Sequence, residues 1–99
     1  MELPIEIDRE ALEAFCRRHP IRRLSLFGSV IHGDFGPDSD VDVLVEFHAD
    51  ARVGYFKLVQ LQMELTEIIG RPVDLRTPGE LSRYFRDQVM REAVLQYAA

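Results

Sequence analysis

The sequence predicts a single α/β or α+β domain with a small sheet, and three observations lead to this prediction. Apolar residues recur at three- and four-residue spacing in segments 11–16 and 58–68, which is typical of amphipathic helices. Short apolar runs at 23–27, 41–47 and 71–76 lie between the helical segments and predict strands. With 99 residues, 46% of them apolar, the chain is long enough to bury its own core.

The first half of the chain predicts a helix, a strand, a short helix and a second strand. The first helix should begin after Asp8, a suitable N-cap, and end before His19-Pro20. Residues 23–27 then predict a strand, 29–33 a short helix or turn, and 34–39 a loop. The central strand is expected at 41–47.

The second half predicts helix, strand, helix. A long helix is expected from about residue 54 to 69, ended by Gly70, and residues 71–76 predict a third strand. Thr77 to Glu80 has the pattern of a capping box with proline at the first helical position. We expect this box to open a helical stretch reaching about Tyr97, with an apolar face of Leu81, Phe85, Val89, Met90, Ala93, Val94 and Tyr97.

Composition excludes several classes of protein. A net charge of −5 argues against direct nucleic-acid binding, and the single Cys16 excludes an internal disulfide or a cysteine-based zinc site. No apolar run approaches the roughly 20 residues that span a bilayer, and the N-terminus does not resemble a signal peptide. We therefore expect no membrane association and a cytoplasmic location.

Asp40 and Asp42 form the most informative feature of the chain. Side chains two residues apart on a strand point the same way, so the two carboxylates should share one face. On a largely buried strand they would repel each other and lose hydration. A hard cation such as Mg²⁺ would remove that repulsion, and Gly28 and Ser29 upstream would let backbone amides approach a phosphate. The alternative is a pair of solvated residues at a strand end.

The glycines do not match two common nucleotide-binding motifs. Gly28 and Gly33 have the spacing of a P-loop, but Asp34 stands where that loop requires lysine, and an acid would repel a phosphate there. The segment is not G-x-G-x-x-G either, so the dinucleotide fingerprint is missing. What remains is Gly-Ser after a strand, a polar loop, and an acidic pair opening the next strand.

This pattern, G-S-x(9)-S-D-x-D with a third acid at Asp74, resembles the DNA polymerase beta-like nucleotidyltransferase superfamily. Within it, the chain looks like the minimal nucleotidyltransferases, which are commonly paired with HEPN-domain proteins as toxin–antitoxin modules. The resemblance implies one domain over residues 1–99, with a small mixed sheet of three or more strands flanked by helices. It also implies Mg²⁺-dependent transfer of a nucleotidyl group, AMP from ATP, to a hydroxyl of a HEPN-domain partner, this chain being the antitoxin.

The resemblance also implies residue roles. Asp40 and Asp42 would hold two Mg²⁺ ions, with Mn²⁺ as an alternative, and Asp74 would bind the catalytic ion and help deprotonate the attacking hydroxyl. Gly28 and Ser29 would hold the triphosphate of the nucleotide.

Ser39 and His32 are further candidates for nucleotide binding. Ser39 opens the acidic motif, where it could also simply close a turn. His32 stands where relatives often carry arginine, and a neutral imidazole makes a weaker phosphate contact than a guanidinium. A second class of function therefore stays open: a binding module that neutralises a partner by contact alone.

Overall fold

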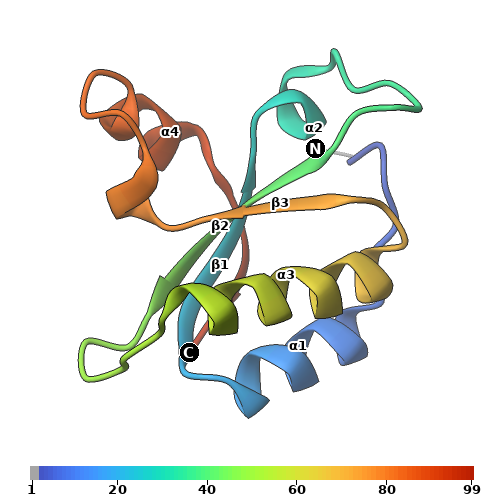
Figure 1. Cartoon of the computed structure of the whole chain (residues 1–99). Helices are drawn as coiled ribbons and strands as arrows, with labels where there is room; N and C mark the ends of the chain where they lie inside the picture. Colours follow the sequence, from blue (N-terminus) through green and yellow to red (C-terminus); the bar gives the residue numbers. More distant parts are fainter. Residues whose placement is uncertain (1–2) are drawn as a thin grey trace.

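Four strands form one sheet, and two helices pack against one of its faces. The computed structural model describes residues 3–99. In Figure 1, α1 and α3 lie below the strands, while α2 and α4 lie above them. The elements are α1 (Arg9–Arg18), β1 (Ile21–Phe27), α2 (Ser29–His32), β2 (Val41–Phe47), α3 (Tyr55–Ile69), β3 (Val73–Arg76), the 3-10 turn η1 (Pro78–Glu80), α4 (Arg86–Glu92) and β4 (Val94–Ala98).

The sheet is mixed and has the strand order β3-β2-β1-β4. Strand β1 runs antiparallel to both β2 and β4, whereas β2 and β3 are parallel and are connected through α3. The predicted fold class, a small mixed sheet of three or more strands flanked by helices, is confirmed.

The core lies between the sheet and the pair α1 and α3. Alternation along the strands turns one set of side chains toward these helices, and each helix contributes an apolar stripe. The expected helix ends are also present, because Asp8 accepts a hydrogen bond from the Ala11 amide at 3.2 Å and Gly70 ends α3 with φ +77°. The buried set includes Leu12, Phe15, Leu24, Leu26, Val41, Val43, Val45, Leu61, Leu65, Val73 and Leu75. Of the helices in residues 3–99, none is both long enough and apolar enough to cross a membrane.

The C-terminal prediction is wrong in part. The capping box of Thr77 and Glu80 is present, but it opens only the one-turn η1, and the helix that follows ends at Glu92. Residues 94–98 form β4, which pairs with β1. The apolar spacing that suggested a helix also suits a strand, since Val94 and Tyr97 favour extended backbone. Pairing with the free edge of β1 supplies backbone hydrogen bonds that a helix here would leave unmade on that edge.

The buried thiol of Cys16 tests the packing of α1. Its side chain is 1% exposed, and burial raises its pKa to about 12. Because the thiolate is the reactive form, a disulfide-exchange reagent at pH 8 should label the native protein far more slowly than the urea-unfolded chain. Absorbance of the released thiol measures both rates. Labelling of native protein at the unfolded rate would contradict this packing.

Candidate active site

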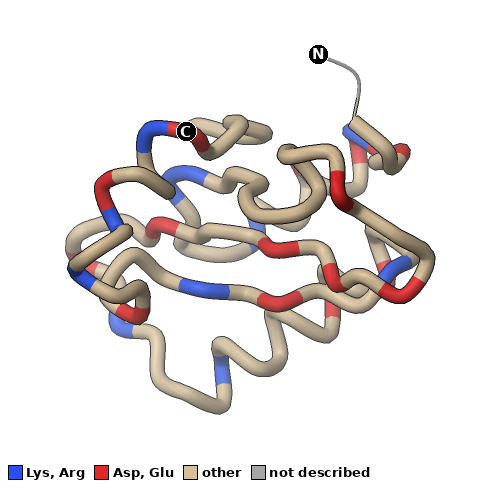
Figure 2. Tube along the Cα trace, turned by 90° about the horizontal axis from the view of Figure 1, so that it is seen from above, with Lys and Arg blue, Asp and Glu red and all other residues tan. Residues whose placement is uncertain are grey.

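Two carboxylates lie side by side on the face of the sheet that points away from α1 and α3. Asp42 of β2 is the register partner of Asp74 in β3, and hydrogen-bonded strands are about 4.8 Å apart. Burial raises the pKa of Asp42, and the charges of Asp74 and Asp40 raise it further, while Arg76 lowers it. The structure thus places Asp42 beside Asp74, with Asp40 close enough for its charge to affect the pKa of Asp42. Figure 2 views this side and shows acidic positions on neighbouring strands.

Gly28 packs directly against the carboxylate of Asp42. It links β1 to α2 with φ +75°, a conformation that other residues rarely adopt. A Cβ built on Gly28 would overlap a carboxylate oxygen of Asp42 and lie 3.1 Å from its Cγ. Ser29 follows as the first residue of α2, where helix amides lack intrahelical partners. The predicted phosphate-binding pair therefore borders the acidic pair.

Ser39 closes the loop that precedes Asp40. Its hydroxyl accepts a hydrogen bond from the Gly36 amide at 2.9 Å, and its own amide donates to the Gly36 carbonyl at 3.1 Å. Arg71 fixes the same loop from outside. Its Nη2 donates to the carbonyls of Gly36, Pro37 and Ser39 at 2.9–3.2 Å, and its guanidinium stacks 4.6 Å from the Phe35 ring centroid. These contacts hold the Asp40 loop against the start of β3.

His32 lies at the last residue of α2, at the opposite end from Ser29. Its Nε2 is 3.1 Å from a carboxylate oxygen of Glu92 in α4, and about half of its side chain is exposed. The structure therefore places His32 against α4, and a phosphate contact by its imidazole stays a prediction.

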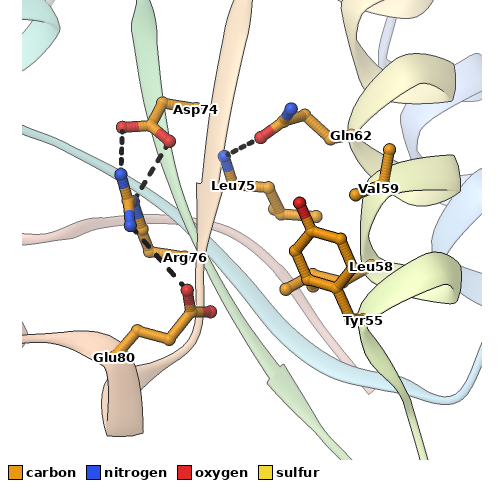
Figure 3. Close-up of a pocket in the computed structure, with 8 residues that line it drawn as sticks. All are labelled: Tyr55, Leu58, Val59, Gln62, Asp74, Leu75, Arg76 and Glu80. Atoms are coloured by element: carbon orange, nitrogen blue, oxygen red, sulfur yellow. Dashed lines mark hydrogen bonds and ion pairs between the residues drawn. The ribbon is translucent and has the colours of Figure 1, made fainter.

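The carboxylate of Asp74 is paired with an arginine. Arg76, two residues along β3 and on the same face, donates from Nε to Oδ1 at 3.1 Å and from Nη2 to Oδ2 at 3.4 Å. Its Nη1 lies 3.8 Å from Glu80. Figure 3 shows Arg76 between the two acids, at one side of a cavity of about 190 Å³. Apolar side chains of Leu58 and Leu75 also line this cavity.

The outer edge of β3 is capped by side chains of α3. The Leu75 amide donates to the Gln62 side chain at 2.9 Å, and the Val73 amide donates to the Thr66 hydroxyl at 3.2 Å. These bonds satisfy amides that would otherwise be unpaired at the sheet edge. They also fix the position of β3 along α3, and with it the position of Asp74.

The acidic cluster suits a hard divalent cation in its chemistry. Carboxylate oxygens are the ligands that Mg²⁺ prefers. Burial, and then the charges of Asp74 and Asp40, raise the pKa of Asp42, and a bound cation would favour its ionised form. Within residues 3–99, however, no three acidic, histidine or cysteine side chains already converge as a metal-binding group. The carboxylate of Asp74 instead accepts two hydrogen bonds from Arg76, one on each oxygen.

Comparison with known proteins agrees with this geometry. The family model of the nucleotidyltransferase domain matches residues 8–96. The chain belongs to this family. It is therefore a nucleotidyltransferase, and the resemblance to the minimal members is confirmed by its relatives.

Two curated relatives are named for protein adenylylation. A protein of Methanocaldococcus jannaschii, named as a candidate protein adenylyltransferase, is 34% identical over 90% of this chain and 92% of its own length. The protein adenylyltransferase MntA of Thermococcus cleftensis is 34% identical over 78% of this chain and 76% of its own length.

Solved structures support the fold of this nucleotidyltransferase. A candidate minimal nucleotidyltransferase is 36% identical, with a TM-score of 0.71, and the match covers 87% of this chain and 86% of that one. A crystal structure of a toxin–antitoxin pair with AMP-PNP has a TM-score of 0.74 at 19% identity, over 94% and 75% of the two chains.

Two arginines of the site were missed from sequence. Arg76 stands two residues after Asp74, a spacing that puts both side chains on one face of a strand, so its pairing could have been expected. Arg71 gives no such signal, because its three acceptors are backbone carbonyls in a loop more than 30 residues away.

The contact between Gly28 and Asp42 can be measured against a matched glycine. Gly33 also has a positive φ, +86°, but a Cβ there would meet nothing within 4 Å. Gly33→Ala should cost about 1–2 kcal/mol of unfolding free energy from strain alone. Gly28→Ala should cost more for two reasons: its backbone, at φ +75° and ψ −146°, is open to few residues other than glycine, and its Cβ would overlap Asp42. Only the second part of the cost should disappear in an Asp42→Ala background. Urea unfolding measures each variant; a Gly28→Ala cost that is the same in both backgrounds would refute the contact.

Partial burial of Asp42 beside two other acids makes the stability of the protein depend on pH. Its pKa is raised in the folded protein from 3.8, so the protonated form favours folding and ionisation costs stability as pH rises through the folded pKa. The unfolding free energy of Asp42→Asn, relative to wild type, should therefore increase from pH 4 to pH 7. Mg²⁺ should reduce the difference at pH 7 by stabilising the wild type. Asp50→Asn, an exposed acid beyond the far end of β2, should show neither effect.

Proposed function

We propose that this nucleotidyltransferase moves AMP from ATP to a hydroxyl of a partner protein, with Mg²⁺ held by Asp40, Asp42 and Asp74. The observation that carries the proposal is the adjacency of Gly28, directly after β1, to Asp42 of β2, which in turn is paired with Asp74 of β3. The backbone at Gly28 suits a triphosphate, and the carboxylates of Asp42 and Asp74 suit cations. Asp42 contacts both Gly28 and Asp74.

The residues divide the chemistry between them. Gly28 permits close approach of backbone to the triphosphate, and the Ser29 hydroxyl adds a donor. Mg²⁺ held by Asp40, Asp42 and Asp74 would supply positive charge that offsets the charge on the α-phosphate of the transferred AMP and on the leaving pyrophosphate. Asp74 takes the proton of the attacking hydroxyl, whose oxygen forms a bond to the α-phosphorus while the bond to pyrophosphate breaks.

ATP and a protein acceptor are favoured by the relatives. The relative from T. cleftensis is named a protein adenylyltransferase, and a structural neighbour was crystallised with AMP-PNP. Another neighbour is an MNT antitoxin in complex with a tri-AMPylated HEPN toxin. We extend this to the present chain as an antitoxin that adenylylates a HEPN-domain partner.

A second candidate function is an antitoxin that acts by contact without transfer. It is favoured by one observation: both oxygens of the Asp74 carboxylate accept hydrogen bonds from Arg76. The two candidates predict different behaviour of the acidic residues, because a contact surface does not need them.

The decisive experiment uses labelled ATP, Mg²⁺ and a HEPN-domain protein encoded beside this chain. Asp42→Asn should lower transfer of label by at least about two orders of magnitude, since it borders both the triphosphate and the cations. Asp74→Asn should reduce transfer by about 10²-fold or more while nucleotide binding is kept, as expected for loss of a general base.

Asp50→Asn is the matched control and should transfer label like the wild type. Transfer would be read by gel autoradiography, nucleotide binding by calorimetry, and neutralisation by growth of cells that express the partner. Full neutralisation by both Asp42→Asn and Asp74→Asn, with no transfer by the wild type, would select the contact-only antitoxin.

A further inference from the structure

The guanidinium of Arg76 places a positive charge of the protein itself at the proposed metal site. Its guanidinium makes a fork on Asp74, with Nε and Nη2 on different carboxylate oxygens at 3.1 and 3.4 Å. This is the geometry in which arginine holds a carboxylate most specifically. Each carboxylate oxygen keeps a further lone pair, but an ion that binds Asp74 beside this fork would meet the positive charge of the guanidinium at close range.

Glu80 offers the displaced guanidinium a second carboxylate. Its Oε1 accepts from the amide and the hydroxyl of Thr77, both at 3.1 Å, so the capping box holds this side chain in place. Its other oxygen, Oε2, faces Arg76 Nη1 at 3.8 Å. Figure 3 shows the guanidinium between the two acids, so a small rotation would tighten its contact with Glu80.

We propose that Arg76 is an exchangeable counter-ion of this site, which neutralises Asp74 before metal binds and moves to Glu80 when a divalent cation takes its place. The inference rests on the proposed metal site. Arg76 is thus a positioning residue: it sets the affinity of the site for metal through Asp74, and Glu80 sets how readily the guanidinium leaves.

The exchange explains how the site tolerates its paired carboxylates without metal and where the guanidinium goes when metal binds. Without metal, Asp42 and Asp74 are neighbours in register, and Arg76 reduces their repulsion. With metal bound, a guanidinium left on Asp74 would repel the ion, whereas one on Glu80 lies against a carboxylate that the proposed metal site does not use. All three side chains are 35–46% exposed, so screening keeps the effect moderate.

Mn²⁺ binding to the nucleotide-free protein tests the exchange without reference to catalysis. Free Mn²⁺ would be followed by electron paramagnetic resonance, and the ion-induced rise in melting temperature would be measured in parallel. Arg76→Gln should bind Mn²⁺ about twofold to fivefold more tightly than wild type, a factor that matches the usual strength of a part-exposed ion pair. Arg76→Lys, which keeps the charge but lacks the fork, should fall between the two.

Glu80→Gln tests the second carboxylate, because glutamine preserves the capping box and removes only the charge. It should weaken Mn²⁺ binding in the wild-type background and have no effect in the Arg76→Gln background, since no guanidinium then needs a place. Arg83→Gln removes a nearby arginine that contacts Tyr84 rather than Asp74, and it should leave Mn²⁺ affinity unchanged. Circular dichroism would verify that each variant is folded.

Three results would overturn the inference. These are an Arg76→Gln affinity no higher than wild type, an Arg76→Lys affinity equal to wild type, or a Glu80→Gln effect that is the same in both backgrounds. The second would mean that Arg76 acts only through its net charge, and the third that Glu80 affects Mn²⁺ binding independently of Arg76. A wild type that binds no Mn²⁺ at millimolar concentration would instead refute the proposed metal site, a failure distinct from equal binding by wild type and Arg76→Gln.

Discussion

The parallel pairing of β2 with β3 is the constraint on which the site depends. It places Asp42 opposite Asp74, and nothing on the polar face itself favours that arrangement. The register is set from the other face, where Val73 and Leu75 are buried against the core at 6% and 4% exposure. A slip of one residue would expose both and turn Asp74 into the core. Burial on one side of the strand therefore maintains charge repulsion on the other.

Arginine rather than lysine suits the contacts that offset this repulsion. The chain has eleven arginines and one lysine. Arg76 uses its planar fork on a carboxylate, and Arg71 reaches three carbonyls while stacking on Phe35. A lysine ammonium could not make either set of contacts in the same way. Two arginines therefore position the acidic residues. Arg76 pairs with Asp74 on β3, and Arg71 binds the loop that leads to Asp40.

The parts of the fold that the sequence predicted are those in which local pattern and burial agree. In the central strand, Val41, Val43, Val45 and Phe47 recur at every second position opposite Asp42 and Glu46, so both its bounds and the face of Asp42 followed from the sequence, although Leu44 interrupts the alternation. Residues 94–98 were misassigned, because their apolar spacing fits a helix as well as a strand and the deciding partner, β1, is about 70 residues away. The close approach of Gly28 to Asp42 could be suspected from Gly-Ser, but its cause is a positive φ next to a neighbouring strand.

The side of the molecule that carries the carboxylates is built differently from the side that carries the core. Between residues 77 and 93 no side chain is fully buried, and this segment is held by individual polar contacts such as His32 with Glu92 and Arg86 with the Leu81 carbonyl. Such contacts contribute little stability each, whereas the apolar layer under the sheet supplies most of it. Because β2 and β3 belong to both sides, the carboxylates are held on rigid strands while the chain around them can change at small cost to the fold. Residues beside the proposed metal site, such as Arg76 and Glu80, can therefore change without disturbing the layer that keeps Asp42 and Asp74 in register.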